Sequence, residues 1–288
     1  MRVHAYRGRF APSPTGPLHL GSLFAALVSW VHARQHRGHW SIRIDDLDAQ
    51  RCDPQWSDAI IATLAAFGLT SDTPIVYQSD RIIAYGEAFA QLSAHTYHCT
   101  CSRKSRAPGP YAGTCRRRLG KSLPLQGAIR VDCASLQCTL DDIIMGHCMY
   151  PHPGDPIIRR TDGLYAYQLA CTVDDATDQI THVIRGVDLL ESTLWQRHLM
   201  HHLHLTPPTY GHFPVLVGHQ GDKLSKQHGA PGINPRQPGQ VFRQLATILE
   251  RPEPPDAGVP IPDWLDWWLA QGDVTSWWPK MRQNIPIA

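Results

Sequence analysis

The chain has 288 residues, of which 42% are hydrophobic and 18% charged. This length and composition exclude a disordered chain and suffice for one large domain or two modest ones. A formal net charge of +2 excludes a strongly basic, non-specific nucleic-acid binder, so any RNA contact should be local. The apolar runs are too short to span a bilayer, and the N-terminus does not resemble a secretory signal. We therefore expect a cytoplasmic protein with no membrane contact.

The first third of the chain predicts strands and helices in alternation. A Gly- and Pro-rich loop at residues 8–17 precedes apolar residues that recur at helical spacing from Leu20 to Val31. Residues 40–44 have strand character, and Asp53-Pro54 is typical of a helix start. A further helix is expected at about residues 79–94. Strand and helix in alternation predict an α/β fold with a parallel, Rossmann-type sheet.

The pattern then breaks into a stretch rich in Cys, Pro, Gly and Arg between residues 97 and 125, which we interpret as an insertion. Residues 128–185 predict short strands and turns, with a hairpin turn at Thr161-Asp162-Gly163 and Tyr167 at the end of its second strand. A helix at 192–205 and a strand at 212–218 should follow. We expect four parts: residues 1–95 and 161–230 as the two halves of the α/β domain, 96–160 as the inserted subdomain, and 231–288 as a short helical tail.

The loop from Pro12 to Ser22 is the first motif with chemical character. It is a stiff Pro-Ser-Pro-Thr-Gly-Pro turn that delivers His19, Gly21 and Ser22 to the start of a helix. Free N–H groups and the helix dipole favour anions there, and an imidazole can hydrogen-bond a phosphate oxygen. The loop therefore predicts a phosphate site, and a plain turn before an ordinary helix is the alternative.

A second motif, Asp222-Lys-Leu-Ser-Lys-Gln227, follows the last predicted strand and a Gly turn. Two lysines on a mobile loop can neutralise negative charge on a leaving pyrophosphate. By itself, the same run is typical of a solvated loop.

Cysteines form the third motif, since Cys99, Cys101 and Cys115 lie within seventeen positions, with Tyr111 between them. Three soft thiolates and an oxygen suit Zn²⁺ in a closed, structural site, and His98 is a competing fourth ligand. Three reduced cysteines in a loop are the alternative. A second histidine-rich group, His198 to His204, lacks a carboxylate or thiol, and we interpret it as a solvated helix face.

These motifs, together with Arg43-Ile-Asp-Asp-Leu-Asp48, occur in an order that resembles the class I aminoacyl-tRNA synthetases. Within that class, Gly8 to Gly16 and Arg43 to Asp48 are similar to the glutamyl branch. The resemblance runs from about Arg7 to about Ala230 and favours Tyr111 as the fourth zinc ligand. It implies that catalysis depends on His19, Lys223 and Lys226. It also implies that ATP, accompanied by Mg²⁺, is bound by Pro12, His19, Gly21, Ser22 and Lys226.

The resemblance also implies a site for glutamate, in which cations meet the carboxylates and an anion meets the ammonium group. The implied residues are Arg9, Phe10, Ala11, Pro12, Ser13, Asp45, Tyr167 and Arg185. Asp45 departs from the glutamyl pattern, which usually has Glu there. Because Asp is one methylene shorter, its contact with the ammonium group is expected through water or after a backbone shift.

The stretch after the second signature is Pro- and then Trp-rich, and it is too short for an anticodon-binding domain. That brevity favours the short glutamyl-Q tRNA(Asp) synthetases, which attach glutamate to the queuosine base of tRNA(Asp). The resemblance then implies glutamate, ATP and queuosine-bearing tRNA(Asp) as partners, and we expect a monomer. Three alternatives stay open: an enzyme that charges a tRNA 3′ end, a non-catalytic tRNA-binding paralogue, and a nucleotidylyltransferase that acts on a small metabolite.

Overall fold

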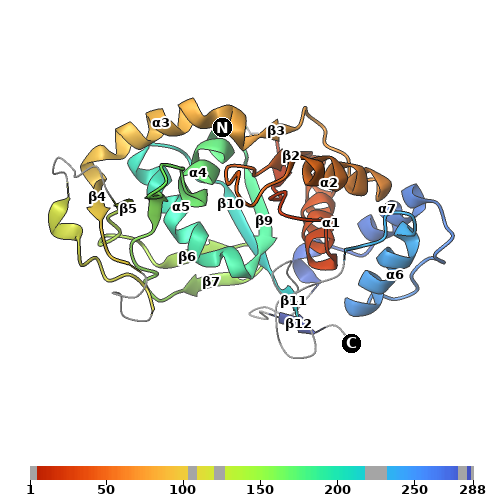
Figure 1. Ribbon diagram of the computed structural model, residues 1–288. Helices are drawn as coiled ribbons and strands as arrows, with labels where there is room; N and C mark the ends of the chain where they lie inside the picture. The colour runs from red at the N-terminus through yellow and green to blue at the C-terminus, as the bar shows by residue number, and fades with distance from the viewer. Residues whose placement is uncertain (1–4, 103–108, 120–126, 218–231, 278–283, 287–288) are drawn as a thin grey trace.

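A computed structural model describes residues 5–102, 109–119, 127–217, 232–277 and 284–286 (Figure 1). The predicted Lys223 and Lys226 lie outside these residues. Within the described part of the chain, no helix is both long and apolar enough to cross a bilayer.

Helices and strands alternate through much of the chain. The strands are β1 (Arg7–Phe10), β2 (His39–Ile44), β3 (Val76–Tyr77), β4 (Thr96–Cys99), β5 (Ala128–Val131), β6 (Thr139–Asp142), β7 (Gly146–Met149), β8 (Ile157–Arg159), β9 (His182–Gly186), β10 (Thr209–Phe213), β11 (Val215–Val217) and β12 (Asn284–Pro286). The α-helices are α1 (Leu20–Gln35), α2 (Pro54–Ala66), α3 (Ile82–Gln91), α4 (Tyr167–Thr177), α5 (Leu190–His202), α6 (Pro238–Ile248) and α7 (Ile261–Leu269).

Parallel pairing confirms the predicted α/β sheet. One part has the order β1-β2-β3, and the other has β7-β6-β10-β9, in which only the β6–β7 pair is antiparallel. The amide of Thr181, just before β9, donates to the carbonyl of Arg7 at 2.9 Å. This bond holds the starts of β1 and β9 side by side, so the carboxyl ends of both strands open on the same edge.

Helix α1 lies at the centre of the larger core. Eleven of its sixteen residues are buried, so it is apolar on most sides rather than along one stripe. It packs between the β1–β9 part of the sheet and the tail helices (Figure 1). On α7, Trp264 and Trp268 are fully buried in the same core, as their helical spacing predicts.

Tyr6 joins the beginning of the sheet to α1. A Cβ atom on Gly38 would lie 2.4 Å from the Tyr6 side chain, so only glycine permits this close approach. The Tyr6 hydroxyl lies 2.7 Å from Nδ1 of the buried His32, and the Tyr6 ring stacks on His182. The first strand and the first helix are thereby held together by a contact that is mostly aromatic.

Two local expectations were wrong. Tyr167 does not end a strand, because residues 167–177 form helix α4. The expected hairpin turn is present but short: Arg159 bridges to Tyr165, and the amide of Arg160 donates to the carbonyl of Leu164 at 2.8 Å. The predicted strand at 212–218 is instead β10 and β11, which are separated at Pro214, since proline has no N–H to donate to a sheet. The other predicted helices and strands of the described chain are present within a few residues.

Protonation of His32 should couple stability to pH. Burial, followed by the nearby His36 and His182, lowers the pKa of His32 from 6.5 to about 3. Between those values the unfolded chain binds a proton at this position that the folded chain does not, so stability falls as the pH falls below 6.5. When the pH is lowered from 6.5 to 5, the free energy of unfolding should decrease by about 2 kcal/mol less in His32→Asn than in the wild type.

Urea unfolding at the two pH values measures that difference. His39→Asn, at an exposed position in β2, is the matched control and should follow the wild type. Equal pH dependence in all three proteins would contradict the role of His32.

Candidate active site

A cavity of about 540 Å³ opens where the carboxyl ends of β1 and β9 diverge. Ligands of open α/β sheets bind at such a divergence, because the loops that follow the strands leave a crevice there. One wall comes from β1 and the loop after it, another from the start of α1, and the third from β9 and the first residue of α4.

Backbone hydrogen bonds hold the loop after β1. The carbonyl of Pro12 accepts from the amide of Asp45 at 2.9 Å, and the carbonyl of Pro14 accepts from the amide of Asp53 at 3.0 Å. The loop is thus fixed to the segment that follows β2. Phe10, Ala11, Pro12 and Ser13 all line the cavity in consequence.

His19 is the N-cap of α1. The amide of Ser22 donates to its Nδ1 at 3.2 Å, and the Ser22 hydroxyl lies 3.0 Å from Nε2. The imidazole therefore satisfies one amide of the first helical turn itself. His19, Gly21 and Ser22 share the cavity wall.

Arg185, near the end of β9, enters the cavity from the opposite side. Its Nη2 donates to the Thr193 hydroxyl at 2.6 Å and to Oε1 of Gln196 at 2.8 Å, and its Nη1 donates to the Tyr167 hydroxyl at 3.3 Å. Thr193 in turn lies 2.7 Å from Nε2 of His212. These contacts from α5 and β10 fix the direction of a buried guanidinium group.

Asp142 completes this chain of contacts behind Arg185. Its Oδ2 lies 2.6 Å from Nδ1 of His212, and both side chains are fully buried. Burial lowers the pKa of His212 although the hydrogen bond to Asp142 opposes that change. A neutral imidazole with its proton on Nδ1 then leaves Nε2 as an acceptor for the Thr193 hydroxyl.

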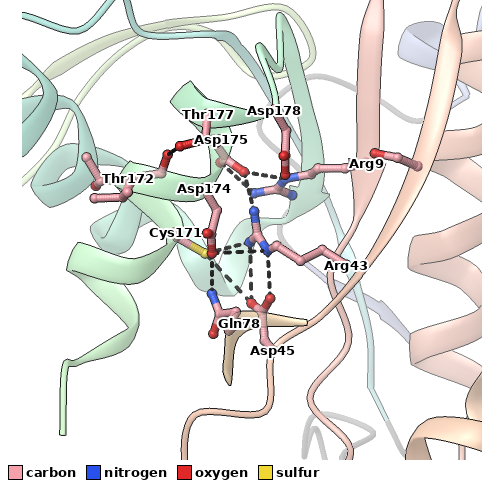
Figure 2. A network of polar contacts seen from close by, with 12 residues as sticks. Arg9, Arg43, Asp45, Gln78, Cys171, Thr172, Asp174, Asp175, Thr177 and Asp178 are labelled. Carbon is pink, nitrogen blue, oxygen red and sulfur yellow. Dashed lines mark hydrogen bonds and ion pairs between the residues drawn. The ribbon is translucent and has the colours of Figure 1, made fainter. Parts of the chain in front are cut away.

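Arg9 approaches the cavity from β1 and is held by a carboxylate on α4 (Figure 2). Its Nε and Nη2 donate to the two oxygens of Asp175 at 3.1 and 3.0 Å. Nη1 has no partner among the described residues. Although burial opposes ionisation of Asp175, the charges of Arg9 and Arg43 outweigh it and lower the pKa of Asp175 to about 2. Arg9 is therefore a fixed cation with one nitrogen left for a ligand.

Asp45 lies behind this pair rather than in the cavity. Its Oδ1 accepts from Nε of Arg43 at 2.7 Å, and Arg43 also donates to Asp175 at 2.7 Å (Figure 2). Asp45 is buried and is not among the residues that line the cavity. Burial raises the pKa of Asp45 despite the charge of Arg43. The Asp45 carboxylate thus pairs with Arg43, a contact that the sequence did not indicate.

The structure brings most of the predicted substrate residues together. Those that line the cavity between β1 and β9 are Arg9, Phe10, Ala11, Pro12, Ser13, His19, Gly21, Ser22, Tyr167 and Arg185. Asp45 lies one layer deeper, and the two lysines lie outside the described residues. Asp174, Asp175, Thr193 and His212, which position the arginines, were missed because nothing in their local sequence distinguishes them from exposed polar residues.

The three cysteines also come together, away from this cavity. The sulfur atoms of Cys99, Cys101 and Cys115 lie within 4.8 Å of one another, and the Tyr111 hydroxyl is 3.4 Å from Cys99 Sγ and 3.7 Å from Cys101 Sγ. His98 is not part of this group, because successive residues of β4 face opposite sides of the sheet. Although burial opposes it, hydrogen bonds from Tyr111 and Arg130 lower the pKa of Cys99 to about 7.

Removing the charge of Asp175 should destabilise the protein. Asp175→Asn leaves Arg9 and Arg43 buried without their shared carboxylate, and breaking such a pair costs about 3–5 kcal/mol. Asp256→Asn is the control, since Asp256 is 91% exposed and pairs with Arg243 at the surface. Chemical denaturation should show a large loss for the first variant and no measurable change for the second. Equal stability of both variants would contradict a structural role for the buried pair.

Comparison with known proteins places the chain in a family. Residues 5–106 and 120–236 match the family model for tRNA synthetases class I (E and Q), catalytic domain. A glutamyl-Q tRNA(Asp) synthetase of Cupriavidus metallidurans is 47% identical over 261 residues, which are 85% of this chain and 84% of the relative. A protein of the same name from Methylococcus capsulatus is 42% identical and covers 97% of this chain and 95% of its own length.

Solved structures show the same fold. A glutamate tRNA ligase from Elizabethkingia meningosepticum superposes with a TM-score of 0.79 at 24% identity, over 99% of this chain and 68% of the other. The glutamate-tRNA synthetase of Elizabethkingia anophelis gives 0.78 at 23% identity, over 98% and 68%. The likeness at this identity concerns the fold, whereas the relatives and the family model define the family. The chain belongs to the class I tRNA synthetases of the glutamate and glutamine branch, among the glutamyl-Q tRNA(Asp) synthetases.

Proposed function

We propose that the chain activates glutamate with ATP and transfers the glutamyl group to queuosine in the anticodon of tRNA(Asp). The names of the relatives support both the activated amino acid and the acceptor. The observation that carries the proposal within the structure is that Arg9 and Arg185 enter one cavity beside the loop that ends at His19. Two fixed cations next to a helix start are what a dicarboxylic amino acid and a triphosphate require.

In the first step, an oxygen of the glutamate α-carboxylate attacks the α-phosphorus of ATP. A new C–O–P bond forms, the bond between the α-phosphorus and the bridging oxygen breaks, and pyrophosphate leaves with the electron pair. The protein contributes position and charge rather than a covalent intermediate. Arg9 and Arg185 hold glutamate carboxylates, with the Tyr167 hydroxyl beside Arg185.

The phosphates of ATP, with Mg²⁺ as its companion ion, are proposed to lie against the start of α1. Pro12, His19, Gly21 and Ser22 are the candidate contacts there. Lys223 and Lys226 are proposed to neutralise the leaving pyrophosphate. Asp45 is a proposed contact of the ammonium group through water, since Arg43 already occupies its carboxylate.

In the second step, a hydroxyl oxygen of queuosine attacks the carbonyl carbon of the adenylate. An ester bond forms, AMP leaves, and the hydroxyl proton passes to solvent or to the leaving group. Charging of a tRNA 3′ end is the less favoured alternative, because the relatives share the glutamyl-Q name. We further propose a cytoplasmic monomer, as its substrates ATP and tRNA suggest, with the four parts of the chain divided at residues 95, 160 and 230.

A zinc ion is proposed for the cysteine cluster, and the geometry fits it. Ligands at zinc distances in a tetrahedron lie about 3.8 Å apart for two sulfurs and about 3.5 Å apart for a sulfur and an oxygen. Cys101 and Cys115 have sulfurs 3.6 Å apart, and the Tyr111 hydroxyl lies at 3.4 and 3.7 Å from two sulfurs. Cys99, Cys101, Tyr111 and Cys115 would therefore hold a closed, structural ion without a large rearrangement.

Loss of one thiolate tests the zinc site. The purified protein should contain about one zinc per chain, and Cys99→Ser should lose the metal and melt at a lower temperature. Cys138→Ser, at a half-buried cysteine outside the cluster, should keep both the zinc and the melting temperature. Metal analysis with thermal unfolding measures both quantities. A metal-free wild type that melts at the same temperature as Cys99→Ser would contradict the site.

Glutamate-dependent ATP–pyrophosphate exchange without tRNA tests the first step. Lys226→Ala and His19→Ala should each slow exchange by about 100-fold or more, since single groups that stabilise developing charge contribute on that scale. Lys280→Ala, a lysine outside the second signature, is the matched control and should not change the rate. Exchange that is unaffected in Lys226→Ala would contradict its assignment.

Transfer of labelled glutamate to tRNA(Asp) tests the second step. Label should appear on queuosine-bearing tRNA(Asp) and be absent when the tRNA carries guanosine at that position. Transfer regardless of queuosine, or label on the 3′-terminal nucleotide, would overturn the proposed acceptor.

A further inference from the structure

A second cavity, of about 520 Å³, adjoins the candidate active site. Tyr167 belongs to both linings, but none of the residues from Pro12 to Ser22 reaches the second cavity. Its walls come from the segment around Tyr111, from the start of α4 and from one face of α5. The second cavity therefore lies beside the proposed glutamate site while it remains separate from the loop at Pro12 to Ser22.

Flat apolar groups make up much of its wall. Pro110, Pro153 and Pro156 contribute, and Trp195 faces the cavity from α5. The indole N–H of Trp195 donates to the carbonyl of Gly154 at 2.8 Å, so the ring is held in place although it is only partly buried. A fixed, accessible indole ring offers a stacking surface.

Polar groups complete the cavity at specific points. Nε2 of Gln168 donates to the Ser192 hydroxyl at 3.1 Å, whereas Oε1 is buried with no partner among the described residues. A buried acceptor without a partner is costly, so this oxygen favours an N–H or O–H group that enters the cavity.

Arg130 supplies positive charge at the same cavity. Only 5% of it is exposed, and its guanidinium group lies 3.9 Å from the centre of the Tyr111 ring. One of its terminal nitrogens donates to the carbonyl of Asp155, while Nε has no partner in the described part of the chain. The cavity thus combines flat walls, an unpaired acceptor and a buried cation, and its lining also includes Glu191 and Asp155, whose carboxylate pairs with Arg116.

We propose that this second cavity is the pocket for the acceptor nucleobase, and that Trp195 stacks on that base while Gln168 accepts from one of its N–H groups. The inference rests on the proposed function and names where its second substrate binds. A purine-like ring matches the flat walls, and its N–H edge matches the Gln168 oxygen. A hydroxyl-bearing substituent on that base would pass Tyr167 and reach the adenylate carbonyl.

Binding of ATP in this cavity is a poorer explanation. The helix start that favours phosphate, at His19 to Ser22, lines the other cavity only. A base that arrives with the tRNA needs no phosphate loop of its own, since its reaction transfers no phosphate.

Two variants of Trp195 test the proposal. Trp195→Leu keeps an apolar side chain but removes the stacking face, and Trp195→Phe keeps an aromatic face. We expect kcat/KM for glutamate transfer to queuosine-bearing tRNA(Asp) to fall by about tenfold or more in the Leu variant and much less in the Phe variant. Glutamate-dependent pyrophosphate exchange without tRNA should stay at the wild-type rate in both. Trp56→Leu, a partly buried tryptophan on α2 outside both linings, is the matched control and should leave both reactions unchanged.

The outcomes separate this inference from the proposed function. No exchange or no queuosine-dependent transfer by the wild-type protein would overturn the proposed function itself. Wild-type transfer that persists within twofold in Trp195→Leu would overturn the base pocket alone. If Trp195→Leu does not fold, Gln168→Leu decides, because it removes the acceptor at similar volume: reduced transfer with normal exchange supports the pocket, and unchanged transfer contradicts it.

Discussion

The bridge from Asp175 to Arg9 and Arg43 is the interaction on which the arrangement of the site depends. Arg9 is on β1, Arg43 is on β2 and Asp175 is on α4, so one carboxylate joins three elements that are far apart in the sequence. A buried charge is tolerated only where it is paired. Here both guanidinium groups donate to the Asp175 carboxylate, and that carboxylate holds both of them in place. The free nitrogen of Arg9 therefore has a defined direction before any ligand arrives, which is the preorganisation that substrate binding requires.

The charges of the arginines and carboxylates around this bridge do not cancel, and a net negative charge remains. Three arginines, Arg9, Arg43 and Arg81, contact four carboxylates, those of Asp45, Asp174, Asp175 and Asp178, so one negative charge is in excess. Gln78 donates to Asp174 (Figure 2), as does the Tyr85 hydroxyl, and both relieve part of this excess. Burial raises the pKa of Asp45, the direction expected for the carboxylate that carries the excess. An amino acid that brings an ammonium group to this end of the cavity would meet a field that favours it, even though Asp45 itself is turned toward Arg43.

The sequence was informative where a motif acts locally and uninformative where a partner comes from far along the chain. The Pro-rich loop, the helix start that follows it at His19 and the Asp53-Pro54 helix start are determined by neighbouring residues, and all three were predicted correctly. Helix α4 was missed because its N-cap, Ala166, has no side-chain acceptor and because Asp174 and Asp175 are typical of exposed positions. Their burial is explained by arginines about 90 to 170 residues away and, for Asp174, by Gln78 and Tyr85 at a similar separation. Spacing in the sequence cannot reveal such pairings.

Tyr167 shows why the missed helix matters for chemistry. As the end of a strand it would have been one more wall residue, but as the first residue of α4 it stands between two cavities while Gln168, its neighbour, turns into the second. Asp175, two turns further along the same helix, holds Arg9. One helix thus aligns the cation of Arg9, a hydroxyl at the boundary between the two cavities and an acceptor on the far side. An enzyme that must hold an adenylate and then admit a bulky nucleotide needs those groups at fixed separations, and a rigid helix provides them.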